Sequence, residues 1–503
     1  MPITRSILEV AERRPDQLAI VGSHDRLSYR DLVSDSARMF AVVTALHGDQ
    51  AQPPTPASET QGIPITAISL DSAFDTARIV AGLAGFRAVS ATIDPRWPLD
   101  HQVGVAISTG IGVVISDSDA LAEALAAQGW TGTVISVARF RERETAIDPA
   151  QAPSPSVRNG AEPFLMLFSS GTTSNPKAFL KSRDQYRANV SVSAAHLEPL
   201  PGVATLAPGP ISYSLTLYAV IECLATGGSV HVADTFAPLE MSRRIEDESI
   251  TRVVAVPAVV RALADAARRS PERFAGLALV VTGGANLPAS IRDRLGEVLP
   301  HTRLISYYGA AEIGFIGDSR AGDGTWISVY DTIEVEIRAE DGTPAAESEL
   351  GTLWVRAAAC SDGYVSGTTD AKLKGPDGWA TVHDQGRIAG GMLQLAGRAG
   401  DVVVTGGHKV SLPEVERAFD SCESLGEVCA VALEDAGLGS VIALVVEQDV
   451  VKDELLAHAR EHLAPQFVPR RIYRLERLPR TVGGKIRRTE TVDLIMQGRG
   501  ERL

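Results

Sequence analysis

The sequence predicts an α/β protein in which mainly parallel sheets carry helices on both faces. Up to residue 306, strand-like apolar runs alternate with helical runs through short connections, a pattern typical of parallel sheets. After Val329 the strands are short and separated by glycine turns, which indicates a β-rich subdomain. We therefore expect a large N-terminal domain, residues 1–397, of two stacked α/β subdomains plus the β-rich subdomain, followed by a small α+β C-terminal domain, residues 398–503.

The first α/β subdomain is expected to end at a linker rich in proline, alanine and serine, residues 150–163. A polar segment with three prolines, residues 48–62, is predicted to be a loop. Strands are placed where short apolar runs occur, and helices where the apolar spacing is amphipathic. The predicted strands are 18–21, 63–69, 88–93, 112–115 and 133–137, and the predicted helices are 6–14, 72–83, 119–127 and a segment from 27 towards 46.

The remaining elements follow the same rules. The second α/β subdomain is predicted to have strands 163–167, 203–207, 229–232, 252–256, 277–281 and 303–306, with helices 184–196, 215–225 and 257–266. The β-rich subdomain is predicted to have strands 332–337, 351–355, 379–382 and 392–395. The C-terminal unit is predicted to have strands 401–404, 427–433 and 441–446 and helices 413–419 and 452–463.

Composition excludes several classes of protein. The 503 residues carry a net charge of −14, which argues against nucleic acid as a partner. No apolar run is long enough for a membrane span, and the first residues lack the apolar core of an export signal. The four cysteines are scattered without a C-x-x-C pair, as expected for buried thiols in a reducing compartment. We expect a soluble cytoplasmic protein.

A loop dense in hydroxyl groups follows the predicted strand 163–167. Residues 169–173 offer four hydroxyls and a glycine, and Lys177 adds a cation; such groups together can cradle phosphate oxygens. An ordinary solvated Ser/Thr loop is the alternative, and the nucleotide P-loop pattern G-x-x-x-x-G-K-[ST] is absent. The residues concerned are Ser169, Ser170, Gly171, Thr172, Thr173 and Lys177.

Three further stretches combine ligand-binding chemistry with a plain structural alternative. The glycines at 283 and 284 could admit a flat ring or simply turn the chain. Tyr308 and Glu312 follow a predicted strand, where open α/β sheets bind ligands, or they are a core tyrosine beside a solvated glutamate. Asp384 could accept hydrogen bonds from two ribose hydroxyls, or it could be a turn former.

The segment 470–488 reverses the charge of the chain, with eight basic residues and one glutamate. This local reversal suggests a surface for phosphates or for an acidic partner, although a solvated basic face is equally expected from charge alone. Lys485 follows Gly483 and Gly484, so it could lie on a flexible tip that reaches into a cleft.

The order of these stretches resembles that of the AMP-forming adenylating enzymes, which include acyl- and aryl-CoA synthetases, peptide-synthetase adenylation domains and luciferases. The resemblance covers essentially the whole chain. Residues 169–177 are similar to T-S-G-T-T-G-x-P-K, residues 308–312 to Y-G-x-T-E and residues 478–485 to L-P-x-T-x-x-G-K. The other similar segments are 27–32, 88–98, 379–384 and 397–416.

The resemblance implies an ATP- and Mg²⁺-dependent acid–thiol ligase that forms an acyl-AMP, releases pyrophosphate and then acylates a thiol. It implies that the hydroxyl loop holds phosphates, Glu312 binds Mg²⁺ and Lys485 bridges the α-phosphate and the acid. Between the two half-reactions the C-terminal domain is expected to rotate at Gly400 and bring Gly407 to the thiol tunnel. The adenine ring is expected to contact five residues, Gly283, Gly284, Ala285, Tyr308 and Gly309. The ribose is expected to contact Asp384 and Arg398.

The identity of the acid and of the acceptor stays open. Ile211, Ser212, Tyr213 and Tyr307 are expected to line the acid pocket, which favours an aryl or short to medium acyl acid over an α-amino acid. We expect CoA as the acceptor, with an acyl carrier protein or a non-thiol nucleophile as alternatives, and a non-catalytic binding protein is the alternative from another class. Residues that depart from the family pattern are Ser174, Ala178, Ala311, His383 and Gly400.

Overall fold

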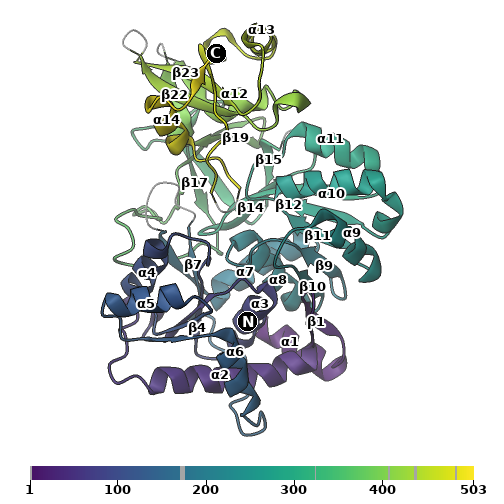
Figure 1. The fold of residues 1–503 in the computed structure, drawn as a ribbon, viewed down its shortest axis with the longest axis vertical. Coiled ribbons are helices and arrows are strands. Elements are labelled where there is room, and N and C mark those ends of the chain that lie inside the picture. The colour runs from purple at the N-terminus through teal and green to yellow at the C-terminus, as the bar shows by residue number, and fades with distance from the viewer. Residues whose placement is uncertain (1–2, 170–175, 323, 406–407, 436–438, 482–483) are drawn as a thin grey trace.

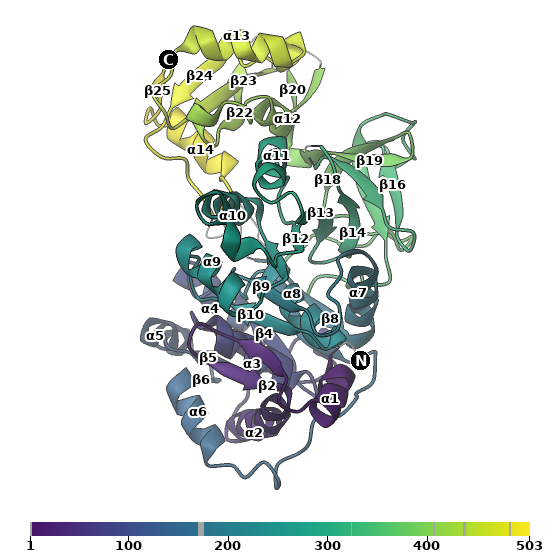
Figure 2. The same cartoon turned by 90° about the vertical axis from the view of Figure 1, so that its right-hand side faces the viewer.

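The computed structural model describes residues 3–169, 176–322, 324–405, 408–435, 439–481 and 484–503. The chain runs from α2 at one end of an elongated molecule to α13 at the other (Figures 1 and 2). Two large sheets and their helices form the first four-fifths of the chain, and two small sheets with three helices follow among the described residues. The observed mixture of parallel sheets and helices confirms the predicted α/β class.

The first large sheet has six strands in the order β6-β5-β3-β4-β7-β8, all parallel except the last pair. The antiparallel pair β7 and β8 flanks the hydroxyl loop, so the loop leaves the sheet at the end of β7 and returns along β8. The strands are β3 (Ile65–Ser69), β4 (Val89–Thr92), β5 (Val113–Ser116), β6 (Thr133–Ile135), β7 (Pro163–Phe168) and β8 (Ala178–Ser182).

The second large sheet has thirteen strands in the order β16-β17-β18-β19-β15-β14-β13-β12-β11-β9-β10-β1-β2. Pairing is parallel from β1 to β13 and antiparallel from β13 to β16. Its strands are β1 (Leu18–Val21), β2 (Arg26–Ser28), β9 (Ala204–Ala207), β10 (Ser229–Val232), β11 (Arg252–Ala255), β12 (Leu279–Thr282), β13 (Arg303–Ala310), β14 (Gly314–Ser319), β15 (Trp326–Val329), β16 (Glu334–Arg338), β17 (Gly351–Arg356), β18 (Asp384–Ala389) and β19 (Met392–Arg398).

The β-rich strands therefore continue the second sheet instead of standing apart from it. The link is β15, which pairs with β14 on one side and β19 on the other. The expected strand at 379–382 is wrong, because only Ala380 makes isolated bridges there. Gly378 before this segment and His383 after it both have positive φ, at +82° and +64°, which bends the backbone out of the extended conformation.

Two helices are buried on nearly every side because they lie between the large sheets. All residues of α3 are buried, and so is the run from Leu215 to Leu224 in α8. Ser72 caps α3 by accepting a hydrogen bond from Asp75 N, and Gly227, with φ of +80°, ends α8. One apolar core runs continuously through both sheets and these helices.

Most of the remaining helices of the N-terminal region cover the outer faces of the sheets (Figure 1), whereas α7 packs between β8 of the first sheet and β14 of the second. The sequence prediction omitted α4, α6, α9 and α11; Ser136, expected inside a strand, instead caps α6 by accepting from Arg139 N. The helices are α1 (Thr4–Arg13), α2 (Tyr29–Gly48), α3 (Ala73–Leu83), α4 (Leu99–Ser108), α5 (Asp119–Ala127), α6 (Val137–Thr145), α7 (Arg183–His196), α8 (Ser214–Thr226), α9 (Pro238–Asp247), α10 (Pro257–Arg269) and α11 (Ala289–Val298).

The last hundred or so residues have their own apolar cores, which contain only residues from Val403 onwards. In the described chain, no helix is long and apolar enough to cross a membrane. The elements of this region are β20 (Val402–Thr405), β21 (His408–Ser411), β22 (Cys429–Asp435), β23 (Gly439–Val446), β24 (Arg471–Arg474), β25 (Glu501–Arg502), α12 (Leu412–Arg417), α13 (Lys452–His462) and α14 (Arg488–Met496).

His47, in the last turn of α2, makes the stability of the first subdomain sensitive to acid. Its Nε2 lies 3.1 Å from Thr66 Oγ1, and its ring fills the space beside Gly112, where a Cβ would lie 2.8 Å from the ring. Burial lowers the pKa of His47 from 6.5 to about 4. The unfolded chain therefore binds a proton more readily than the folded chain, and stability present above pH 6.5 is lost as the pH falls through 4.

We expect this residue to contribute up to about 3 kcal/mol to the loss of unfolding free energy between pH 7 and pH 4. Urea unfolding of the wild type and of His47→Gln at both pH values measures the contribution. The variant should lose less stability than the wild type over this interval. Equal losses would show that His47 is not the group that titrates.

Candidate functional site

A short antiparallel ribbon positions one carboxylate and one guanidinium at the centre of the candidate site. The turn between β18 and β19 consists of Gly390 and Gly391, both with positive φ, as a two-residue hairpin turn requires. The resulting register places Asp384 directly opposite Arg398, and Arg398 Nε lies 3.4 Å from Asp384 Oδ1. Two of the residues expected at the ribose are therefore neighbours.

Tyr308 joins this group from β13, a strand of the same sheet as β18 and β19. Its hydroxyl donates to Asp384 Oδ2 at 2.6 Å. Burial and the adjacent carboxylate raise the pKa of Tyr308 well above its usual range, so the phenol remains a donor at neutral pH. Gly309 follows it at a point where a Cβ would lie 2.5 Å from Gly314 O, so only glycine fits the tight β13–β14 pairing.

Lys485 approaches the same group from the C-terminal region. Its surface is accessible to water, but surrounding protein atoms desolvate the ammonium, and this desolvation and the charge of Arg398 lower the pKa of Lys485 while Asp384 opposes the shift. Gly484, with φ of +82°, precedes it, and Lys485 N donates to Thr481 Oγ1 at 3.1 Å. The fold thus brings Tyr308, Asp384 and Arg398 into contact, and Lys485, 177 positions after Tyr308, lies within electrostatic range of the Asp384–Arg398 pair.

Glu312 lies in the tight connection between β13 and β14, and only 7% of it is exposed. Its carboxylate Oε1 accepts a hydrogen bond from Tyr364 at 3.2 Å, and its main-chain oxygen accepts from Lys181 Nζ at 2.8 Å. The neighbouring Ala311 O accepts from Tyr218 at 2.8 Å. Side chains from three other elements therefore fix this connection.

The described ends of the hydroxyl loop lie beside Glu312. Ser169 N donates to Lys177 O at 2.9 Å, which closes the loop at its base. Ser169 Oγ is buried without a hydrogen-bond partner among the described residues, and Lys177 Nζ lies 5.3 Å from the centre of the Tyr364 ring. The expected phosphate residues Ser170, Gly171, Thr172 and Thr173 lie outside the described residues, as does the expected thiol-tunnel residue Gly407.

The glycine stretch after β12 divides into two parts. Gly283 is covered by Tyr307, since a Cβ there would lie 2.5 Å from the tyrosine ring. Gly284 and Ala285 are exposed, and Gly284 has φ of +78°. Of the three residues expected beside adenine, these two are therefore open to a ligand, whereas Gly283 lies against a side chain.

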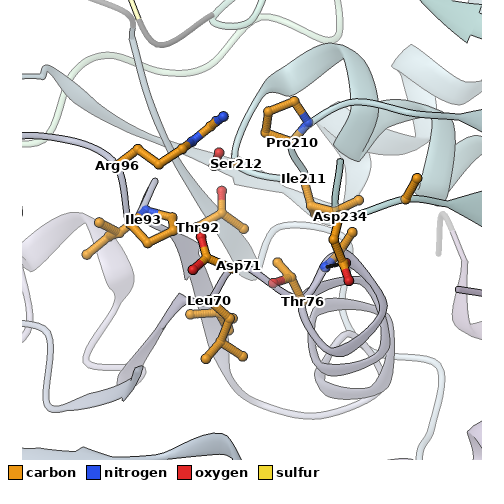
Figure 3. A pocket seen from close by; sticks show the side chains of 14 residues that line it. Leu70, Asp71, Thr76, Thr92, Ile93, Arg96, Pro210, Ile211, Ser212 and Asp234 are labelled. Carbon is orange, nitrogen blue, oxygen red and sulfur yellow. Dashed lines mark hydrogen bonds between the residues drawn. The ribbon is translucent and has the colours of Figure 1, made fainter. Parts of the chain in front are cut away.

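The residues expected to line the acid pocket occupy two different places. Ile211 and Ser212 line a cavity of about 60 Å³ between the ends of β3, β4 and β10, in which Arg96 and Asp234 lie on opposite sides (Figure 3). Ser212 Oγ donates to Asp94 Oδ2 at 3.0 Å, so its hydroxyl already has a partner. Tyr213 precedes α8 and interacts electrostatically with Arg96, and Tyr307 lies against Gly283 and Phe315.

Comparison with known proteins identifies the class to which this arrangement belongs. The family described as AMP-binding enzyme matches residues 7–365, and its C-terminal domain matches residues 414–485. The chain belongs to the AMP-binding enzyme family. It is therefore an AMP-forming ligase, which confirms the class that the ordered motifs indicate.

Full-length relatives of this AMP-binding enzyme include the uncharacterized acyl--CoA ligase YhfT of Bacillus subtilis (strain 168), 27% identical over 97% of both chains. Two solved structures share the fold. ATP-bound MatB from Rhodopseudomonas palustris has a TM-score of 0.84 and 19% identity, covering 97% of this chain and 98% of that one. The amide bond synthetase McbA from Marinactinospora thermotolerans has a TM-score of 0.81 and 21% identity, covering 98% and 99%.

The basic segment of this AMP-binding enzyme is largely neutralised by its own fold. Acidic side chains from other segments pair with five of its arginines, which does not support the predicted surface for phosphates or an acidic partner. Arg488, for example, pairs with Asp401 and Glu416. The other pairs are Arg471–Asp435, Arg474–Asp449 and Arg474–Glu501, Arg480–Glu427 and Arg480–Glu447, and Arg487–Glu490.

Gly400 lies in a short 3₁₀ turn, Ala399–Asp401, between the ribose group and the C-terminal region of the AMP-binding enzyme. Its φ is not in the left-handed region, and a Cβ there would meet no atom within 4 Å. The backbone at this position therefore does not require glycine. The residues that sequence reasoning missed are Tyr364, Lys181 and Tyr218, whose partners lie 52 to 178 positions away in the sequence.

Proposed function

We propose that this AMP-binding enzyme activates a small carboxylic acid with ATP and transfers the acyl group to the thiol of CoA. The observation that carries the proposal is the Asp384–Arg398 pair, which accepts a hydrogen bond from the Tyr308 hydroxyl at Asp384 and lies near enough to Lys485 for both charges to act on its ammonium. A cation beside a ribose-binding carboxylate is placed to act where the α-phosphate and the acid meet. The acyl–CoA ligase name of YhfT supports CoA as the acceptor.

In the proposed first half-reaction, a carboxylate oxygen attacks the α-phosphorus, the new O–P bond forms and the bond to pyrophosphate breaks. Lys485 would stabilise the negative charge that accumulates between the acid and the phosphate. Asp384 would accept hydrogen bonds from the ribose hydroxyls with Arg398 beside it, and the Tyr308 ring would stack on adenine. Catalysis then rests on positioning and on neutralising charge.

The phosphates are assigned to the hydroxyl loop and to Lys177, and a divalent cation to Glu312. The buried Glu312 carboxylate is a hard oxygen ligand of the kind that Mg²⁺ prefers. The Ser169 hydroxyl, which has no hydrogen-bond partner among the described residues, is suited to a phosphate oxygen. Bound Mg²⁺ would neutralise charge on the phosphates. Lys177 would add a second positive charge on the side of the loop.

We assign the C-terminal unit, residues 398–503, to a domain that rotates between the half-reactions, with Gly400 as the hinge. The open space around Gly400 is compatible with rotation, and no side chain there can favour either orientation. An acyl carrier protein is a less favoured acceptor, because the arginines that suggested an acidic partner are paired within the fold. An amine acceptor is a further outcome that the experiment must test.

ATP–pyrophosphate exchange across a panel of fatty, benzoic, hydroxycinnamic and amino acids tests the proposal. We expect exchange with a short acyl or aryl acid, followed by thioester formation with CoA but not with a holo-carrier protein. Absence of exchange with every acid would contradict adenylate formation. Exchange followed by amide formation alone would contradict the thiol acceptor.

Tyr307 is assigned to the far wall of the acid pocket. Its ring lies between Gly283 and Phe315, and the centroids of the Tyr307 and Phe315 rings are 4.8 Å apart. Tyr307→Ala should therefore lengthen the pocket. For acids that are longer by a ring or several carbons, kcat/KM should rise roughly tenfold, since each accommodated methylene contributes about 1–3 kcal/mol. Kinetics across a chain-length series measure this shift.

Tyr307→Phe is the matched control, because it keeps the ring and should keep the preference for short acids. Unfolding curves of both variants separate a changed preference from a loss of folded protein, since truncating a buried aromatic ring costs about 3–5 kcal/mol. An unaltered preference in a folded Tyr307→Ala variant would place the acid elsewhere.

A further inference from the structure

Residues 361–368 form a short segment that pairs with the strand following the hydroxyl loop. Val365 N donates to Ala178 O at 2.8 Å, and Tyr364 makes an antiparallel bridge with Phe179. The pairing begins at the first residue of β8, next to Lys177. Residues 361–368 are thus hydrogen-bonded to β8 at the point where the hydroxyl loop ends.

The same segment also holds Glu312. Ser361 N donates to Glu312 O at 2.8 Å, and the Tyr364 hydroxyl donates to Glu312 Oε1 at 3.2 Å. Glu312 is separated from β8 by 130 positions in the sequence. Residues 361–368 therefore connect two parts of the site that lie far apart in the sequence.

A second contact fixes the backbone of Glu312 independently of Tyr364. Lys181 is 2% exposed, and its Nζ donates to Glu312 O at 2.8 Å and to Ala359 O at 2.7 Å. Lys181 and Ser361 already fix the main chain of Glu312. The hydroxyl of Tyr364 therefore acts on the orientation of the Glu312 carboxylate.

The ring of Tyr364 serves a second group at the same time. Lys177 Nζ lies 5.3 Å from the ring centroid, within the distance of a cation–π contact. One side chain therefore touches both the ammonium at the end of the hydroxyl loop and the buried carboxylate. These are the two groups assigned to phosphate and to the divalent cation.

We propose that Tyr364 is a positioning residue that sets the Glu312 carboxylate and the Lys177 ammonium relative to each other for a cation–phosphate pair. The inference rests on the proposed function of those two residues and deepens it. The hydroxyl orients the carboxylate, and the ring supports the ammonium. Tyr364 itself touches neither the acid nor the reacting phosphorus.

The test uses Tyr364→Phe, which keeps the ring and removes the hydroxyl. Calorimetric titration gives the Kd of ATP in EDTA and in Mg²⁺, and AMP without metal reports an intact nucleotide site. We expect the Mg²⁺-dependent tightening of ATP to fall about tenfold, the range of one hydrogen bond to a charged group, while AMP affinity and KM for the acid stay unchanged. The kcat of exchange should fall by a similar factor.

Tyr330→Phe is the matched control, because Tyr330 also donates to a buried carboxylate, but to Asp318 Oδ2 at 3.3 Å and not to Glu312. It should leave the Mg²⁺-dependent tightening unchanged. The inference is overturned if Tyr364→Phe keeps the full tightening, or if it weakens AMP as much as MgATP. The proposed function fails separately, if the wild type itself shows no exchange and no Mg²⁺-dependent tightening.

Discussion

Lys485→Ala should reduce adenylate formation by roughly 10²–10³-fold, the range found when one preorganised donor to a developing oxyanion is removed. The reason is the position of the ammonium beside Asp384 and Arg398, where the acid and the α-phosphate would meet. ATP–pyrophosphate exchange at saturating substrate measures this step. Thioester formation from chemically prepared acyl-AMP and CoA should stay close to the wild-type rate, because the proposed role of Lys485 belongs to the first half-reaction alone.

Arg477→Ala is the control for this experiment, since Arg477 is an exposed cation in the same basic segment. It should leave both half-reactions unchanged. If Lys485→Ala retained normal exchange, the assignment of this lysine would be wrong. If it lost both half-reactions, the lysine would act on the structure of the C-terminal region and not on the charge of the first step.

Asp384→Ala should raise the Kd of AMP roughly 10–100-fold, because hydrogen bonds to a charged group contribute about 1.5–3 kcal/mol. Asp384 is only 16% exposed in its side chain and faces Tyr308 and Arg398. Its loss would remove the proposed acceptor for the ribose hydroxyls and would leave Arg398 without its partner. Calorimetric titration with AMP in the absence of metal isolates this effect from the phosphate groups.

Asp377→Ala is the matched control, because Asp377 is an exposed carboxylate in the preceding glycine turn and pairs with Arg338. AMP affinity should be unaffected in that variant. A change of less than about twofold in Asp384→Ala, well below the effect of one charged hydrogen bond, would mean that the nucleotide is held by other residues.

The fold class could be predicted, and candidate site residues could be selected, because both depend on short local patterns in the sequence. Alternating apolar runs indicate parallel sheets, and the stretches at 308–312 and 379–384 keep their motif order whatever the tertiary contacts are. The expected strand at 379–382 was wrong because positive φ angles at Gly378 and His383 break it. Such angles are not evident from apolar spacing, because residues other than glycine adopt them uncommonly, histidine more often than most.

The interactions that support the site could not be predicted, because they depend on which distant side chains meet. Tyr364 and Glu312 are 52 positions apart, and neither stretch indicates the other. The basic segment shows the same limit, since the acids that neutralise Arg488 lie 72 and 87 positions before it. A sequence gives the sum of charges along a segment, whereas the tertiary fold decides which charges pair.

Strand β13 places Tyr307 and Tyr308 next to each other, and consecutive residues of a strand point to opposite sides. One contacts Gly283 and Phe315, and the other contacts Asp384. Under the proposed roles, one of these two adjacent residues determines which acid is accepted and the other binds the nucleotide. Each can be substituted without altering the contacts of the other. Descendants of this chain could diverge in the acids they accept through position 307 while selection keeps position 308 constant.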